Sequence, residues 1–159
     1  MANEVISQKR LLIVSHAPSP NTLRLCRAVV DGVLDSSSVE VVVKPPLEAG
    51  VEDVFAANAL ILGTPENLGY MSGALKDFFD RIYYPCLDRT RGLSCALYIR
   101  AGQSAGSASR RSIEIITTAL GWRMVQEPLI LSGPYSDEFV QSCTELGQAM
   151  AAGLDTGIF

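Results

Sequence analysis

Two polar segments, each placed directly after an apolar run, carry the side chains best suited to binding chemistry. The first, residues 15–22, follows the run 11–14 and precedes a helical pattern that starts near Leu23. The first N–H groups of a helix lack partners and attract anions, so hydroxyl and amide side chains at this point suit a phosphate. Polar residues before a helix are also typical of an ordinary capped surface loop. The candidate phosphate ligands are Ser15, Ser19, Asn21 and Thr22.

The second segment, Gly-Thr-Pro-Glu-Asn-Leu-Gly-Tyr-Met-Ser-Gly at 63–73, follows the run 59–62 and leads into another helical pattern. It is long for a strand-to-helix connection, which typically spans about two to six residues. Leu68, Tyr70 and Met71 place apolar or aromatic bulk there, which a flat ligand would cover. Open α/β folds bind ligands at the carboxyl ends of their strands. The segment therefore predicts a binding site, with an ordinary connecting loop as the alternative.

The two segments together resemble those of the flavodoxin-like FMN proteins, and more closely those of the small NAD(P)H-dependent FMN and quinone reductases. In those families the first segment wraps the FMN phosphate with a turn often written Thr-Gly-Asn-Thr. Ser19-Pro20-Asn21-Thr22 matches this turn except at Pro20, which has no N–H to donate. The second segment looks like the reductases' segment that lies against the isoalloxazine ring. The matching residues are Gly63, Thr64, Pro65, Gly69 and Met71.

The resemblance implies flavin contacts along the second segment. Pro65 and Leu68 would cover the ring, and backbone N–H groups from 66 to 69 would reach N1, O2 and N5. Reduction places negative charge on the N1–O2 side, which fixed dipoles stabilise. A carboxylate there would oppose this charge, so we expect the Glu66 side chain to point into solvent or bind another backbone group. The expected contacts are Thr64, Pro65, Glu66, Asn67, Leu68, Gly69 and Met71.

A third segment, 100–107, follows the fourth apolar run and is rich in glycine and serine. A comparable segment of the reductases approaches the pyrimidine end of the flavin, so the resemblance implies contacts from Ala101 and Gly102. Arg100 or Gln103 would then bond O2 or O4, and a flexible surface loop is the alternative. We expect the only histidine, His16, to bond the phosphate or ribityl chain or to lie exposed, and we predict no catalytic side chain.

Alternating apolar runs and helical patterns predict the elements that position these segments. Strand candidates lie at 11–14, 39–43, 59–62, 94–99 and 128–131. Several of them are continuous apolar runs, which are typical of strands covered on both faces. Helical patterns lie at 23–34, 51–57, 73–84, 109–120 and 137–152. The expected N-caps are Thr22, Ser72, Ser109 and Ser136, and the expected helix stops are Gly121 and Gly153.

This order of elements predicts an α/β fold with a five-stranded parallel sheet and helices on both faces. The resemblance supplies the flavodoxin-like three-layer α/β/α class and the strand order 2-1-3-4-5. In that order the first and second segments leave neighbouring strands. Sequence pattern and fold therefore predict one shared crevice.

Composition limits the protein to a narrow set of classes. A chain of 159 residues with 48% apolar content predicts one domain, 1–159. The formal charge of −4 argues against nucleic-acid binding, and no run has the length of a membrane span or the core of a signal peptide. We therefore expect a cytoplasmic protein that binds neither nucleic acid nor membrane. The four scattered cysteines suggest no zinc or dithiol centre, and only Cys86, after Pro85, is expected to be exposed.

The resulting hypothesis is an FMN-dependent oxidoreductase that passes electrons from NAD(P)H through bound FMN to a small acceptor such as a quinone or flavin. The cofactor carries such chemistry, so no general base is required. The resemblance also implies a homodimer or homotetramer, and we expect core or dimer packing for Tyr83, Tyr84, Trp122 and Phe139. The alternatives are a flavodoxin-type carrier that docks to protein partners and a flavodoxin-fold binding protein without flavin.

Overall fold

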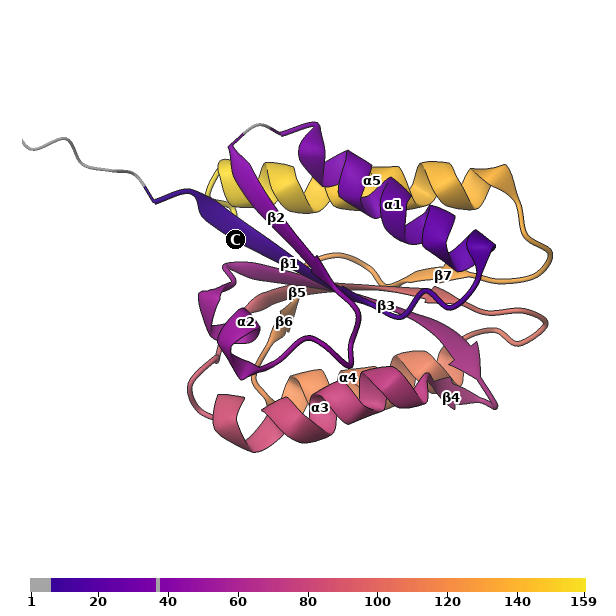
Figure 1. The fold of residues 1–159 in the computed structure, drawn as a ribbon, viewed down its shortest axis with the longest axis horizontal. Helices are drawn as coiled ribbons and strands as arrows, with labels where there is room; N and C mark the ends of the chain where they lie inside the picture. Colours follow the sequence, from indigo (N-terminus) through magenta and orange to yellow (C-terminus); the bar gives the residue numbers. More distant parts are fainter. Residues whose placement is uncertain (1–6, 37) are drawn as a thin grey trace, which may run out of the picture.

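The computed structural model describes residues 7–36 and 38–159, in which a parallel sheet lies between two layers of helices (Figure 1). The strand order is β2-β1-β3-β5-β6, which confirms the flavodoxin-like class and, apart from extra short strands, the predicted order. The strands are β1 (Lys9–Ser15), β2 (Val39–Lys44), β3 (Ala59–Asn67), β4 (Tyr70–Met71), β5 (Ser94–Arg100), β6 (Arg123–Met124) and β7 (Leu129–Leu131). The helices are α1 (Pro20–Leu34), α2 (Val51–Ala56), α3 (Gly73–Cys86), α4 (Ser107–Ala119) and α5 (Asp137–Asp155).

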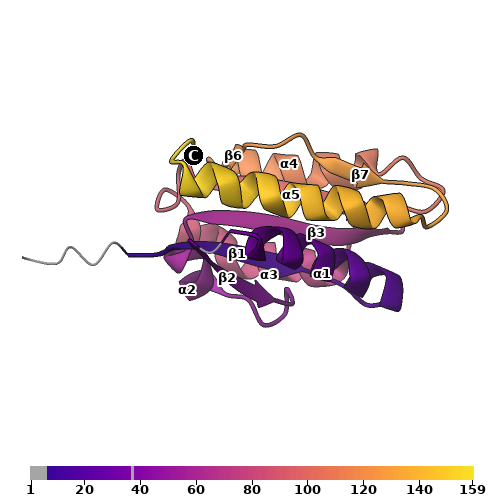
Figure 2. The same cartoon turned by 90° about the horizontal axis from the view of Figure 1, so that it is seen from above.

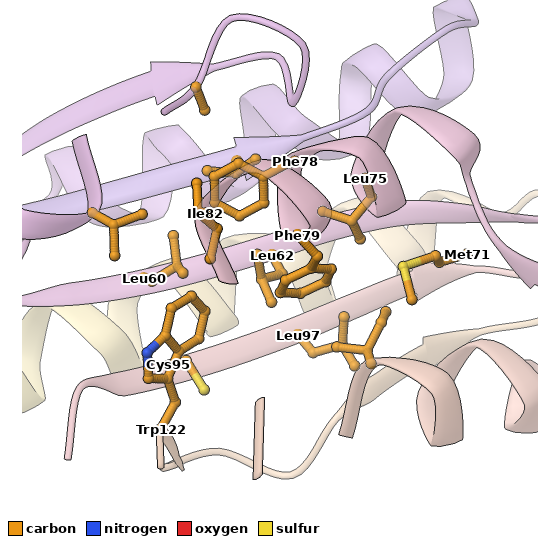
Figure 3. Packing of buried hydrophobic residues seen from close by; sticks show 14 of the residues in the cluster. Leu60, Leu62, Met71, Leu75, Phe78, Phe79, Ile82, Cys95, Leu97 and Trp122 are labelled. Carbon is orange, nitrogen blue, oxygen red and sulfur yellow. The ribbon is translucent and has the colours of Figure 1, made fainter. Parts of the chain in front are cut away.

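Each face of the sheet has its own apolar core because side chains alternate along the strands. Leu11 and Ile13 of β1 face α1 and α5, which cross the same face of the sheet (Figure 2). Leu12 and Val14 face the layer of α2, α3 and α4. Phe78 and the other apolar residues of α3 fill that second core (Figure 3). Both faces are therefore covered, as the continuous apolar runs predict.

The predicted fifth strand is divided into two short pieces. β6 pairs with the start of β5 at Ser94 and Cys95, whereas β7 pairs with its end, from Tyr98 to Arg100. Pro128, immediately before β7, has no N–H to give to a sheet ladder. The prediction of a strand at 128–131 is therefore correct for its last three residues, and the two-residue strand β6 is too short to produce a recognisable pattern.

Two helices begin earlier than predicted. Ser19, rather than Thr22, is the N-cap of α1, and Pro20 occupies the first helical position, where its fixed φ is favourable. Gly106, rather than Ser109, is the N-cap of α4 and adopts a left-handed φ of 71°. The predicted N-caps of α3 and α5, which are Ser72 and Ser136, are confirmed.

Two predictions about helix ends are wrong. Gly153 does not stop α5, which continues to Asp155; a Cβ at Gly153 would lie 2.0 Å from the Phe159 ring, so the glycine allows a close contact. Cys86 is buried rather than exposed, because α3 continues through Pro85 and carries Cys86 into the core. Burial raises the pKa of its thiol. In the described residues, no helix combines the length and apolarity that a bilayer span requires.

Candidate functional site

The carboxyl ends of β1, β3 and β5 bring the three predicted segments to one edge of the sheet, at the right of Figure 1. Ser15, the last residue of β1, pairs with Gly63 of β3, and the His16 N–H donates to the Gly63 carbonyl oxygen (N···O 3.0 Å). Pro65 of β3 pairs in turn with Arg100 of β5. The predicted meeting of the first two segments is therefore confirmed at their bases.

The first segment is held at the start of α1 by hydrogen bonds between its own residues. The Thr22 N–H donates to Ser19 Oγ (3.2 Å), and the Ser19 N–H donates to Thr22 Oγ1 (3.0 Å), which together form a capping box. The two hydroxyl groups also lie 2.8 Å apart, and when Thr22 donates to Ser19 Oγ the Ser19 hydroxyl keeps its hydrogen for a ligand. Asn21 is exposed in the same turn. The segment is thus preformed at a helix N-terminus.

The Ser15 hydroxyl does not face the same way as these groups. It lies 2.6 Å from the Tyr98 hydroxyl, and both side chains are buried. The sequence predicts this hydroxyl as a phosphate ligand, whereas the structure commits it to an internal hydrogen bond. Ser15 therefore fixes the start of the first segment to the sheet and is not available to a ligand.

His16 carries a polar atom without a partner. Its Nδ1 is buried, and no hydrogen-bond partner for it occurs among residues 7–36 and 38–159. Burial lowers the pKa of the imidazole, which favours the neutral ring. A buried polar atom costs free energy unless it is hydrogen-bonded, so a bound ligand would stabilise this side chain.

The second segment is a β-hairpin rather than an open loop. β3 continues to Asn67 and pairs with β4, which leaves Leu68 and Gly69 as a two-residue turn with φ values of 53° and 70°. Two left-handed residues are the requirement of a type I′ turn, but for leucine this conformation costs about 1 kcal/mol. Leu68 is also fully exposed. A strained, exposed apolar tip beside a predicted site suits contact with a ligand.

The base of the hairpin is buried and internally bonded. Thr64 Oγ1 donates to the Pro65 carbonyl (2.8 Å) and accepts from the Ser72 N–H (3.0 Å). Met71 is buried in the core below the hairpin (Figure 3). The expectation that Met71 contacts the ring is therefore corrected: its side chain supports the hairpin from below, because residue 71 of β4 faces the core.

Glu66 joins the hairpin to helix α4. Its carboxylate accepts from the Ser109 hydroxyl (2.6 Å) and from the Ser109 N–H (3.1 Å), in the first turn of the helix. Burial alone would raise the pKa of Glu66, but hydrogen bonds from Ser104 and Ser109 outweigh it and lower the pKa. Of the two expected outcomes, solvent or another backbone group, the structure shows the second, with the Ser109 hydroxyl as an additional donor to the carboxylate.

The third segment is tied to the strand beside it. The Ala101 N–H donates to the Leu131 carbonyl (2.9 Å), and the Gly102 carbonyl accepts from the Gly133 N–H (2.6 Å). The Arg100 guanidinium donates to the carbonyls of Leu131 (3.0 Å) and Gly133 (2.8 Å). Arg100, one of the two side chains predicted to bond the flavin, is therefore a structural residue, whereas Gly102 is exposed.

Sequence reasoning missed two supporting residues of this edge. Tyr98 is the one aromatic residue of β5, which is a weak signal for a special contact. The sequence predicts Ser109 as an N-cap, whereas Gly106 fills that role three residues earlier and Ser109 bonds Glu66. Both contacts join elements that are far apart in sequence.

These residues fit a phosphorylated flavin. The start of α1 offers the Ser19 hydroxyl and a helix N-terminus to a phosphate. His16 Nδ1 needs a polar partner, and Leu68 offers an exposed apolar surface at the tip of the hairpin that continues from this edge. The carboxylate of Glu66 is already bonded, so it does not stand unpaired against the ring.

Known proteins of this fold include flavodoxins. A flavodoxin of Aquifex aeolicus is 23% identical over 157 aligned residues, which cover 89% of this chain and 85% of that protein. A flavodoxin structure from the domain Archaea superposes with a TM-score of 0.78 at 20% identity, covering 92% of this chain and 99% of that one. A flavodiiron core from Synechocystis superposes with a TM-score of 0.78 at 15% identity, covering 96% of this chain and 37% of that one. At these identities the structural matches show the fold.

The match to a protein family is more specific. The sequence profile of the NADPH-dependent FMN reductases matches residues 15–134, a range that contains all three segments and most of the chain. This match supports an FMN-binding flavoprotein oxidoreductase. The chain therefore belongs to the NADPH-dependent FMN reductase family.

Proposed function

We propose that the protein binds FMN across the first two segments and uses it to pass electrons from NAD(P)H to a small acceptor such as a quinone or a free flavin. The observation that carries this proposal is the junction of the two segments, where Ser15 pairs with Gly63 and the His16 N–H bonds the Gly63 carbonyl. A phosphate-binding turn and an apolar hairpin tip start from adjacent strands. One ligand with a phosphate and a flat ring can contact both.

The first segment would hold the phosphate end. The Ser19 hydroxyl and the N-terminus of α1 are the available donors, and Pro20 contributes none. Asn21 is exposed in the same turn and can donate through its side-chain amide. Neutral donors and a helix dipole would therefore bind the dianion, and Arg24 is engaged with Asp137 instead (3.4 Å).

The hairpin would hold the ring. FMN, when bound there, would supply the redox chemistry of hydride and electron transfer. The hairpin residues orient the ring and keep water from part of it, with Leu68 as the apolar cover. The hydrogen bonds from Ser109 hold the Glu66 carboxylate at α4, which limits its repulsion of negative charge on the ring.

Steady-state kinetics of the FMN-loaded protein test this function. With a quinone or free FMN as acceptor and no partner protein, we expect continuous consumption of NADPH or NADH. The same assay without acceptor is the control. If neither nucleotide reduces the bound flavin, the reductase proposal is wrong.

A flavodoxin-type electron carrier is the second candidate, and the named relative in Aquifex aeolicus favours it. A carrier would bind FMN but show little turnover with NAD(P)H and a quinone, because its reductant is another protein. Failure to bind FMN at all would support the third candidate, a binding protein of this fold that has no flavin.

The proposal includes assembly as a homodimer or homotetramer. Tyr84 of α3 and Ile115 of α4 are both largely exposed on the same helical layer, so Tyr84 is not a core residue. Apolar side chains of this size are suited to a contact between subunits. Light scattering should give a mass of two or four chains of 17.1 kDa, and a monomer would contradict the proposal.

A further inference from the structure

A buried pair of hydroxyl groups crosses three strands directly beneath the first segment. Ser15 of β1 pairs with Gly63 of β3, and Gly63 pairs with Tyr98 of β5, so the three residues form one row across the sheet. The Tyr98 hydroxyl reaches over β3 to within 2.6 Å of Ser15 Oγ. The phenol therefore connects two strands that are not neighbours.

The row requires a glycine at its centre. A Cβ on Gly63 would lie 2.3 Å from Tyr98 Cζ and 2.4 Å from its hydroxyl oxygen. Real Cβ atoms do not approach so closely, and the ring has no free space to move into because it is buried. Because Gly63 has no side chain, the Tyr98 ring can pass close to β3 and reach Ser15.

Both hydroxyl groups are buried, with Ser15 6% exposed and Tyr98 3% exposed, and each is the hydrogen-bond partner of the other. Cys26 also lies within hydrogen-bonding reach of the Tyr98 hydroxyl. Burial, followed by the nearby Cys26, raises the pKa of Tyr98 well above its usual value, and the phenol stays neutral. Removing the Tyr98 hydroxyl leaves the Ser15 hydroxyl buried without this partner.

The pair lies where the first segment leaves the sheet. Ser15 is the last residue of β1, and the next N–H, that of His16, bonds Gly63. Four residues after Ser15, Ser19 caps α1. The position of Ser15 therefore sets where the turn with Ser19 begins relative to the hairpin that continues from Gly63.

We propose that Tyr98 is a positioning residue for the phosphate-binding turn: its bond to Ser15 holds that turn in register with the hairpin, and so favours a phosphorylated flavin over an unphosphorylated one. The inference rests on the proposed binding of FMN. Tyr98 acts through Ser15 and touches no ligand, because it is buried beneath the segment.

Paired affinities for FMN and riboflavin test the proposal, since the two ligands share a ring and differ in the phosphate. Quenching of flavin fluorescence gives both dissociation constants. Tyr98→Phe should weaken FMN binding about tenfold and riboflavin binding less than about twofold, because the change acts on the phosphate side. Ser15→Ala should give the same selective loss, and the double variant should lose no more than either single variant.

The matched control is Ile61→Val, which removes one methylene from the same buried face of β3 without touching the hydroxyl pair. It should leave the ratio of the two affinities unchanged. If Tyr98→Phe weakens both ligands equally, or neither, Tyr98 is only a core residue and the proposal fails.

Hydrogen exchange of the apoprotein tests the same contact without any flavin. Tyr98→Phe should speed exchange of the His16 amide about tenfold relative to amides in α5, because the bond to Gly63 opens more readily. Unchanged exchange at His16, or an equal increase throughout the protein, would overturn the proposal. If the wild-type protein binds no FMN but the His16 amide responds, the proposed function fails while the support of the turn by Tyr98 stands.

Discussion

The two segments that meet at the sheet edge are held in different ways. The first closes its hydrogen bonds locally, through Ser19 and Thr22, and rests on the buried Tyr98. The second is fixed from the side by Glu66, which reaches the distant helix α4, and it ends in a strained leucine. The first segment is held by hydrogen bonds between its own uncharged residues. The hairpin is held by a carboxylate, so its stability depends on whether Glu66 is ionised. The capping box of the first segment should therefore be insensitive to pH, whereas the contact of Glu66 with α4 should depend on pH.

The largest effect is expected where the two segments meet. Gly63→Ala would drive a Cβ into the Tyr98 ring and should lower the free energy of unfolding by about 3 kcal/mol. Urea denaturation of the apoprotein measures this loss. Gly73→Ala is the matched control, because nothing lies within 4 Å of its Cβ position. Equal stabilities for the two variants would show that the close approach of Tyr98 is unimportant.

Glu66→Gln tests the contact between the hairpin and α4. Loss of the charged acceptor for Ser109 should lower the free energy of unfolding by about 1.5 kcal/mol at pH 7, the low end for a charged hydrogen bond because Glu66 is partly exposed. The folded pKa of Glu66 is below its ordinary value of 4.5, so this stabilisation is present above about pH 4.5. It is lost as the pH falls through the folded pKa.

Denaturation of both proteins as a function of pH measures this difference. The gap between wild type and Glu66→Gln should close in acid. A gap that stays constant down to low pH would mean that the carboxylate charge does not support the hairpin.

Ser19→Ala tests the capping box of the first segment. Removal of the N-cap hydroxyl should lower the free energy of unfolding by about 1 kcal/mol, with no change in this cost between pH 5 and pH 8, because no titrating group takes part in the capping box. Thermal or urea denaturation gives the cost, and FMN affinity should fall with it. A pH-dependent cost would remove the contrast between the two segments.

The smallest effect is expected at the hairpin tip. Leu68→Gly should raise the free energy of unfolding by about 0.5 kcal/mol, since glycine adopts a φ of 53° without strain but loses entropy on folding. The same variant should bind flavin more weakly because the apolar cover is gone. Greater stability with unchanged flavin affinity would show that Leu68 does not contact the ring.

The sequence predicted the main strands well because continuous apolar runs such as 59–62 and 94–99 are strong local signals. It missed the hairpin because Leu68-Gly69 is an unusual pair for a type I′ turn, in which asparagine or aspartate before glycine is typical. It also placed the start of α1 too late, because the apolar periodicity begins after Pro20.

The candidate site could be located from sequence but its internal bonds could not. Ser15 and Met71 were both assigned to ligand contact, yet Ser15 bonds Tyr98 and Met71 packs in the core. Those outcomes depend on which residues of distant strands and helices lie beside them. Local spacing contains no such information. The chemistry of reduced flavin predicted that the Glu66 carboxylate would be in solvent or bonded to another backbone group, and it is bonded to Ser109.

The most direct test of the central claim is an NMR titration of the apoprotein with FMN, which follows the backbone amides of both segments together. Binding of one ligand across the junction predicts that amides of 15–22 and of 64–72 shift with the same dissociation constant and saturate at equimolar FMN. Shifts confined to one segment, or absent from both, would contradict the account.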